Sequence, residues 1–256
     1  MVKASKNELT SLFKQAFEGM GYDFGGYESA ADMIVWAQMH GLNSFEKIRK
    51  RLPTIVQDKR ESVAQCRVTS DGELVIDAKA NSSIAVAAMA LDIAYVEAIK
   101  SEVACVSVLN CYDRNLVVKK LVDCALRGML CLAYWHDGEV LHWVTSDTGV
   151  CCPEYAKYPL KNWPEAKFLQ GKDQQSLFVV CAKNKPALQA YITQYLPRLN
   201  EMSPIIMLPK MMKSSYLEAL TNGIEIDNDF WKELATIGLK VLVESTEQSR
   251  MGAGAS

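Results

Sequence analysis

The sequence has no apolar run long enough to cross a membrane, and no apolar signal segment opens its 256 residues. A transmembrane helix needs about 20 predominantly apolar residues, so we expect a cytoplasmic protein without membrane contact. The chain also lacks an excess of basic residues, since its formal net charge is -2 and its pI is about 6.0. Nucleic-acid-binding domains usually carry a basic face, so we expect no nucleic-acid partner.

Metal-binding spacings are absent as well. There are three histidines, with no His-x-His or His-Glu-x-x-His pattern, and the eight cysteines include no Cys-x-x-Cys pair. Five of the cysteines lie in apolar runs, where a thiol behaves as a small hydrophobic group: Cys105, Cys111, Cys124, Cys131 and Cys181. Cys151 and Cys152 are too close together to chelate a metal alone. We therefore expect a reduced compartment and no metal site.

No glycine-rich segment suits a dinucleotide pyrophosphate, and no internal repeat or low-complexity segment occurs, so we expect no cofactor. The composition, 49% hydrophobic and 23% charged, is typical of a globular protein. We predict one compact unit over 1–256, with a helical layer at 1–60, a mixed α/β core at 61–183, and C-terminal helices and a tail at 184–256. The glycine-alanine tail is expected to pack against a second subunit, which favours a homodimer.

The central stretch, 67–113, organises the rest of the chain. It predicts a strand, a turn at Ser70-Asp71-Gly72, a second strand over 73–78, an apolar helix over 83–100 and a strand over 103–109. The last strand shows no alternation, which indicates burial on both faces. It delivers Asn110, Cys111, Tyr112 and Asp113 to its carboxyl end. In open α/β sheets, ligands collect at such ends.

Helices and strands alternate along the rest of the chain. Ser5 and Glu8 form a capping box for a first helix, and Gly41 ends a second helix that begins near Tyr27. Ser44 is expected to cap a short third helix, and Pro53 to stop it. Later segments predict a helix over 116–126, strands over 129–135, 139–145, 177–182 and 203–209, an irregular crossing over 146–175, and helices over 186–197, 216–220 and 229–243. The fold class is therefore α/β with a mixed sheet and an N-terminal helical layer.

This order of elements over residues 1–135 resembles the malate/L-lactate/sulfolactate dehydrogenase family, the NAD(P)-dependent group that is unrelated to Rossmann-type lactate enzymes. The family's first motif, Asp-Ser-His-Gly followed by an arginine, is similar to Asn43-Ser44-Phe45-Glu46 with Arg49. Its second motif, Arg-Asn-Ser-x-His-Phe-Gly after an apolar strand, is similar to the stretch that contains Asn110 and Asp113. The resemblance implies the same fold.

The resemblance also implies that two histidines have been replaced. In the family, the second-motif histidine acts as a general acid/base for hydride transfer, and the first-motif histidine and arginine hold the substrate. Here Phe45 and Asp113 stand at the two histidine positions. An unperturbed aspartate has a pKa of ~3.9 against ~6.5 for histidine, so it serves acid/base chemistry near neutral pH poorly. The whole chain, including its end at 244–254, resembles an uncharacterised bacterial family of about this length, a domain of unknown function.

The candidate site residues each have a structural alternative. Arg49 can bind a carboxylate through a bidentate fork or lie on a solvated face, and Asp113 can serve a site or cap the helix that follows. His40 can bind a ligand or complement a helix end. Cys111 can be a nucleophile only if its thiolate is stabilised; otherwise it is a packing residue. Ser44 and Asn110 complete the substrate-binding set that the resemblance implies.

Three functions follow as hypotheses. The first is a relative without dehydrogenase activity that binds a small carboxylate metabolite or a partner protein. The second is an active enzyme, either a divergent NAD(P)-dependent oxidoreductase acting on a 2-hydroxyacid-like substrate or an enzyme that uses Cys111. The third is a structural subunit that pairs with an active dehydrogenase or with itself.

Overall fold

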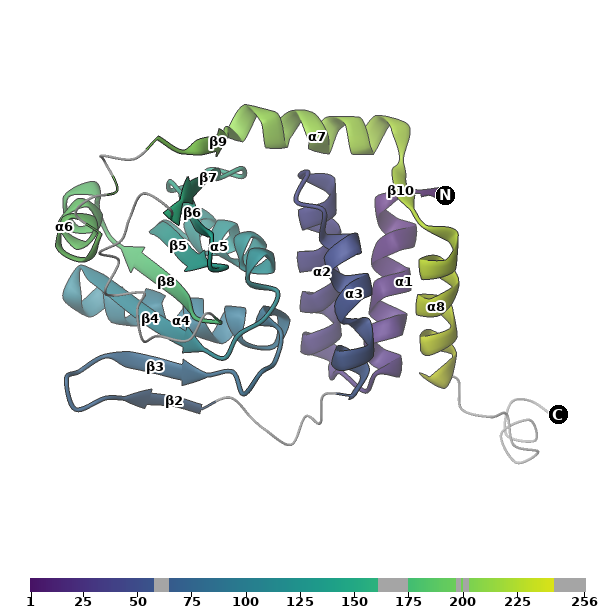
Figure 1. Cartoon of the computed structure of the whole chain (residues 1–256), viewed down its shortest axis with the longest axis horizontal. Helices are drawn as coiled ribbons and strands as arrows, with labels where there is room; N and C mark the ends of the chain where they lie inside the picture. Colours follow the sequence, from purple (N-terminus) through teal and green to yellow (C-terminus); the bar gives the residue numbers. More distant parts are fainter. Residues whose placement is uncertain (58–64, 161–174, 197–198, 200–202, 242–256) are drawn as a thin grey trace, which may run out of the picture. The chain divides into compact units, whose positions relative to one another are not determined.

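The computed structural model describes residues 1–57, 65–160, 175–196, 199 and 203–241, and these form two compact units (Figure 1). One unit contains residues 1–31 and 223–256, and the other contains residues 32–222. The predicted tail beyond residue 241 lies outside the described residues. A single unit with three consecutive sub-regions was expected, and the contacts instead bring the two ends of the chain together.

The first unit is built from both termini. Strand β1 (Val2–Ala4) pairs antiparallel with β10 (Ile224–Ile226). Helix α1 (Lys6–Gly19) packs against α8 (Asn228–Gly238), which continues into the 3-10 turn η4 (Leu239–Val241). The apolar stripe of α1 is buried: Leu9, Leu12, Phe13, Ala16 and Phe17.

The caps of these two helices follow their sequence signals. The predicted capping box is confirmed, because the Ser5 hydroxyl accepts from the Glu8 amide and the Glu8 carboxylate accepts from the Ser5 amide. Asp227 caps α8 by accepting from two backbone amides, those of Asp229 and Phe230.

The second unit contains an eight-stranded mixed sheet in the order β2-β3-β4-β8-β5-β6-β7-β9. Its strands are β2 (Gln65–Val68), β3 (Leu74–Asp77), β4 (Val103–Leu109), β5 (Leu130–His136), β6 (Val140–Ser146), β7 (Glu154–Pro159), β8 (Leu177–Ala182) and β9 (Ile205–Met207). The β3–β4 pair is parallel and every other neighbouring pair is antiparallel. The predicted mixed α/β class is therefore confirmed.

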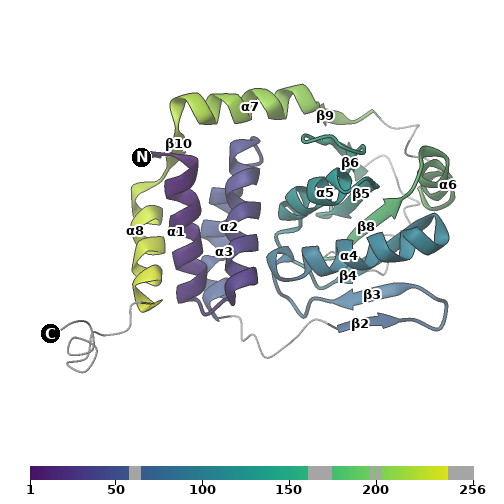
Figure 2. The same cartoon turned by 180° about the vertical axis from the view of Figure 1, so that it is seen from behind.

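Helices cover both faces of this sheet. Helix α4 (Ser83–Ser101) packs across β4 and β8, and α5 (Val117–Leu126) packs beside α4 and against β5 (Figure 2). Helix α6 (Lys185–Tyr195) packs on the opposite face, over a cluster that includes Leu132, Tyr134, Phe178 and Val180. Helices α2 (Phe24–Met39), α3 (Ser44–Gln57) and α7 (Pro209–Asn222) complete the chain.

The structure corrects two predicted elements. Helix α3 does not stop at Pro53 but continues to Gln57, with Ile48, Leu52 and Ile55 in one buried stripe. Packing of that stripe offsets the amide hydrogen bond that proline cannot make. The crossing predicted to be irregular over 146–175 contains strand β7, flanked by Pro153 and ending at Pro159, where a strand end tolerates proline. The rest of that crossing, 161–174, lies outside the described residues.

The predicted burial of β4 on both faces holds only in part. Within β4, full burial begins at Val106, because a cavity lies against the amino end of the strand. Helix α4 buries one face, but Val96 and Ile99 are about half exposed, at 49% and 48%. Among the described helices, none combines the length and the apolar character that crossing a bilayer would require.

Candidate functional site

Four strand ends meet at one edge of the large sheet. Strands β3 and β4 run parallel, so their carboxyl ends, at Asp77 and Leu109, lie side by side. Strand β8 runs the opposite way between β4 and β5, so its start at Leu177 lies beside the ends of both neighbours. This edge therefore gathers the loop 110–113, the end of β5 and the approach to β8. It is the place where the sequence predicts a site.

The loop 110–113 is fixed by backbone hydrogen bonds. The Cys111 amide donates to the Gln175 carbonyl over 2.7 Å, and the Tyr112 amide donates to the Asn81 carbonyl over 3.0 Å. The Ser83 amide donates to the Tyr112 carbonyl, and its hydroxyl donates to the Asp113 carbonyl, both over 2.8 Å. A loop held in this way is preorganised, because its side chains are positioned before any ligand arrives.

Two residues of the loop adopt a left-handed backbone, Asn110 at φ 52° and Asp113 at φ 51°. This conformation is costly for most residues and is tolerated best by asparagine and aspartate, so the residue types match it. Asn110 is further tied down because its Nδ2 donates to Asp77 Oδ1 over 2.9 Å. That bond lowers the pKa of Asp77, and the Lys79 amide, at 2.8 Å from the same oxygen, lowers it further.

Replacing Asp77 by alanine should loosen this loop. Asp77→Ala removes the acceptor for Asn110 and the Lys79 amide, which should cost roughly 0.5–1.5 kcal/mol of unfolding free energy at pH 7. Because the folded-state pKa of Asp77 is lowered, its contribution is present above pH ~4 and disappears as the pH falls through that lowered value. Urea unfolding at pH 7 and pH 3 checks this. An equal difference between wild type and variant at both pH values would contradict it.

Asp113 occupies the position before the 3-10 turn η1 (Arg114–Leu116), but its side chain forms no capping hydrogen bond. Its carboxylate instead lies 3.9 Å from Nε of Arg51, and 5% of its side chain is exposed. The Arg51 guanidinium covers the Tyr112 ring at 4.3 Å. The Asp113 side chain therefore lies beside Arg51 and does not cap the turn that follows.

Cys111 does not have the environment of a nucleophile. It is fully buried, and burial raises the pKa of its thiol to about 12, although the positive charge of Arg114 opposes the shift. The thiol stays protonated at neutral pH, and only the thiolate attacks. Burial therefore favours the packing alternative for Cys111 over the nucleophile alternative.

The other candidates lie as follows. Ser44 is buried, and its hydroxyl donates to the Ile34 carbonyl over 2.7 Å, which ties the start of α3 to α2. The His40 ring stacks on the rings of Trp36 and Tyr216, with centroid distances of 3.8 Å and 5.0 Å. Its Nδ1 atom lies 2.7 Å from the Trp36 carbonyl oxygen. Arg49 is exposed on α3. Ser44 and His40 thus have structural contacts of their own.

A second group of charged side chains extends the edge site. Lys47 is exposed as a whole residue, yet surrounding protein lowers the pKa of its ammonium group. Lys157 on β7 adds to this shift through like-charge repulsion, whereas Asp113 and Asp137 oppose it. Lys47 and Arg51 stand one helical turn apart, so they share a face of α3. Together these residues make a site rich in positive charge beside two carboxylates.

Asp137, His142 and Tyr155 form a hydrogen-bonded chain within the same group. His142 Nε2 lies 2.9 Å from Asp137 Oδ2, and His142 Nδ1 lies 2.7 Å from the Tyr155 hydroxyl. An ionised carboxylate only accepts, so Nε2 carries the proton and Nδ1 accepts from the tyrosine. Burial lowers the pKa of His142 and Asp137 opposes the shift, while burial raises the pKa of Tyr155.

Sequence reasoning missed Arg51 and the hydrogen bonds that join Asp137, His142 and Tyr155. The resemblance pointed to Arg49, but residues two apart on a helix point about 200° apart. Arg49 and Arg51 therefore flank the buried stripe of α3 on opposite sides. That stripe, Ile48, Leu52 and Ile55, was the available signal, although it does not say which flank meets position 113.

A cavity of about 630 Å³ lies elsewhere on the sheet, against the amino end of β4 and α6. Aromatic and acidic side chains line it, including Tyr134, Tyr191, Glu73 and Glu97, and the described lining contains no lysine, arginine or histidine. A small carboxylate would be repelled there. The edge site has the complementary charge.

Comparisons with known proteins identify the fold. Residues 4–86 match the model of a family described as a protein of unknown function (DUF3726). No curated protein matches the sequence. The fold is malate/L-lactate dehydrogenase-like. Three similar structures have this fold at low sequence identity.

A malate dehydrogenase from Pyrococcus horikoshii OT3 is 13% identical, with 95% of this chain and 96% of that chain covered and a TM-score of 0.66. A sulfolactate dehydrogenase from Methanocaldococcus jannaschii is 11% identical, with 92% and 96% covered and a TM-score of 0.61. A delta1-piperideine-2-carboxylate reductase from Pseudomonas syringae pvar. tomato is 11% identical, with 93% and 100% covered and a TM-score of 0.58. Likeness at this level carries the fold and leaves activity open, so the expected loss of catalysis and the expected homodimer stay predictions.

Proposed function

We propose that this protein binds a small carboxylate metabolite at the sheet edge and does not oxidise 2-hydroxyacids. The observation that carries the proposal is the state of Arg51. Its Nε and Nη2 atoms are buried and form no hydrogen bond within the described part of the chain, and its ion pair with Asp113 is long, at 3.9 Å. Buried guanidinium nitrogens that donate no hydrogen bond are costly unless a partner completes them.

The geometry of this arginine suits a carboxylate. Nε and Nη2 lie on one edge of the guanidinium, the edge that binds both oxygens of a carboxylate in a bidentate pair. Tyr112 supports the guanidinium plane from one side. Lys47 and Lys157 add positive charge nearby, so an anion gains long-range attraction as well as directed hydrogen bonds.

The chemistry of the similar structures points the same way. The names of three of these structures contain malate, sulfolactate and delta1-piperideine-2-carboxylate, which are all small carboxylates. The absence of dehydrogenation is supported by Asp113, which stands where the resemblance places a histidine acid/base. An aspartate carboxyl matches acid/base chemistry near neutral pH less well than a histidine does.

Titration calorimetry with L-malate, L-lactate and sulfolactate tests the binding site. We expect Arg51→Gln to weaken binding of the acid that the wild type takes best by about 10- to 100-fold, because hydrogen bonds to charged groups contribute about 1.5–3 kcal/mol. Arg49→Gln is the matched control, on the exposed flank of the same helix, and should bind like the wild type. Arg51→Lys should restore only part of the affinity, since lysine keeps the charge but not the fork.

Two results would overturn this assignment: no carboxylate binds the wild type, or Arg49→Gln loses affinity while Arg51→Gln keeps it. The amide of the same acid should not bind, because it lacks the charge that Arg51 recognises.

The competing function is a divergent NAD(P)-dependent oxidoreductase. The Asp137–His142–Tyr155 chain favours it, because a histidine held by a carboxylate can move a proton in place of the missing family histidine. Incubation of the purified chain with NAD(P)⁺ and the same acids separates the two functions. Formation of reduced nicotinamide that stops in His142→Gln would establish the oxidoreductase and end the proposal of a binding protein.

A further inference from the structure

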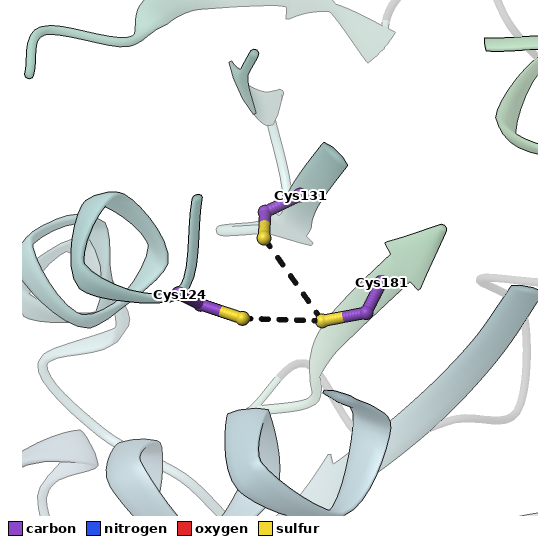
Figure 3. A group of neighbouring side chains, drawn as sticks. All are labelled: Cys124, Cys131 and Cys181. Atoms are coloured by element: carbon purple, nitrogen blue, oxygen red, sulfur yellow. Dashed lines mark hydrogen bonds between the residues drawn. The ribbon is translucent and has the colours of Figure 1, made fainter. Parts of the chain in front are cut away.

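Three cysteines from three different elements meet beneath α5 (Figure 3). Cys124 lies on α5, Cys131 on β5 and Cys181 on β8. Cys131 and Cys181 stand opposite one another in the β5–β8 register, so both point to the sheet face that α5 covers. All three are fully buried, with no exposed surface.

The sulfur positions match those of a coordinated ion. Cys124 Sγ lies 3.6 Å from Cys181 Sγ, and Cys131 Sγ lies 4.0 Å from Cys181 Sγ. All three sulfurs lie within 4.8 Å of one another. Three thiolates placed about 2.3 Å from a central ion are about 4.0 Å apart in a trigonal plane. The 4.0 Å side already matches this spacing, the 3.6 Å side needs a small lengthening, and the third side is at most 4.8 Å.

The donor set selects the kind of ion. Every donor is sulfur, and no histidine, aspartate or glutamate of the described residues joins the group. Thiolates prefer soft ions such as Cu(I), whereas structural zinc almost always takes four ligands. The three side chains have no exposed surface, so bulk solvent does not reach the sulfurs to supply a fourth ligand. These features favour three-coordinate Cu(I) over zinc.

The end of α5 offers an ion a route to the cluster. Arg127, just beyond this end, pairs with Asp92 over 2.8 Å on the surface. Cys124 stands in the last turn of α5, three residues before Arg127, so local opening of that turn gives an ion access.

Packing is the alternative explanation, because buried thiols commonly behave as small hydrophobic groups. Cys111 is an example of a packing cysteine, because its Sγ atom lies 3.6 Å from the Tyr112 carbonyl oxygen. The cluster differs because three sulfurs converge on one point from three separate positions in the sequence. Packing alone needs no such convergence.

We propose that Cys124, Cys131 and Cys181 form a trigonal thiolate site for a soft monovalent d10 metal ion of the Cu(I) type. Each thiol that binds exchanges its S–H bond for an S–Cu bond and releases its proton to solvent. Copper enters and stays as Cu(I), so no electron is transferred.

Anaerobic titration of the reduced full-length chain with Cu(I), in competition with the chelator bicinchoninate, tests the site. We expect one tightly held Cu(I) per chain, and X-ray absorption should show three sulfurs at about 2.3 Å. Cys181→Ser removes the sulfur that contacts both others and should weaken retention at least 100-fold. Cys124→Ala, on the helix, is a second variant with the same expectation, and circular dichroism confirms that each variant is folded.

Cys66→Ser and Cys151→Ser are the matched controls, because both residues are exposed. The second control also breaks the neighbouring Cys151–Cys152 pair, whose sulfurs are 4.0 Å apart. Both controls should retain the ion as the wild type does. The site is overturned if bicinchoninate removes all copper from the wild type, if Cys181→Ser and Cys124→Ala bind as tightly as the wild type, or if Cys151→Ser abolishes binding.

Discussion

Phe230→Ala is expected to lower the free energy of unfolding of the terminal unit, which contains residues 1–31 and 223–256, by about 3–5 kcal/mol. Phe230 is 1% exposed on α8, and its ring meets that of Phe13 on α1 edge-to-face, with centroids 6.2 Å apart. Truncation removes the transfer free energy of a buried ring and leaves a cavity that two rigid helices cannot close. Alanine itself is compatible with the helix, so the loss comes from packing.

Hydrogen exchange measured peptide by peptide checks this prediction. Protection of α1 and α8 should fall together, because the two helices form one packed pair, while β5 and β8 in the other unit keep theirs. Phe24→Ala is the matched control, since Phe24 is 72% exposed and its removal should change stability by less than ~0.5 kcal/mol. If α8 loosened while α1 kept its protection, the discontinuous unit would be wrong.

Local signals predicted the elements of the chain well. The capping box at Ser5 and Glu8 lies within four residues, and the hydroxyl and carboxylate that complete it are close in any helical chain. The sequence predicts strand β8, Leu177–Ala182, with its observed bounds. Six consecutive apolar residues between polar flanks indicate a strand that is buried on both faces of a sheet.

Long-range pairings were not predictable in this way. Nothing within Val2–Ala4 indicates that its partner is Ile224–Ile226, because each segment is only three residues long. The division into two units depends on that pairing and on the contact of α1 with α8. Strand β7 was missed for a related reason: prolines at both of its ends mimic an irregular segment, and only pairing with β6 reveals a strand.

The sequence predicts the region of the candidate site but not the set of residues that meet there. The carboxyl end of β4 follows from the order of elements, whereas the choice of Arg51 over Arg49 depends on which flank of α3 faces Asp113. The cysteine cluster depends on the register of β5 and β8, which sets Cys131 opposite Cys181. These two cysteines are 50 residues apart in the sequence. Their alignment in neighbouring strands is a property of the folded sheet, and no spacing rule in the sequence encodes it.

Gly19→Ala is expected to destabilise the same terminal unit by roughly 1–3 kcal/mol. A Cβ atom at Gly19 would overlap the Ile237 carbonyl oxygen and lie 2.9 Å from the carbonyl carbon and 3.3 Å from Gly238 Cα. These are backbone atoms of α8, so the clash is relieved only by moving one helix away from the other. That movement also loosens the Phe13–Phe230 contact.

Gly25→Ala separates this effect from helix propensity. A Cβ at Gly25 meets no atom within 4 Å, so alanine there should stabilise α2 by up to about 1 kcal/mol. The same gain is available at Gly19, which lies in α1, so a net loss there is a lower bound on the clash of backbones. Urea unfolding followed by circular dichroism should therefore shift to lower concentration in Gly19→Ala and to equal or higher concentration in Gly25→Ala. A shift of both variants to higher concentration would mean that α1 and α8 do not approach closely at Gly19.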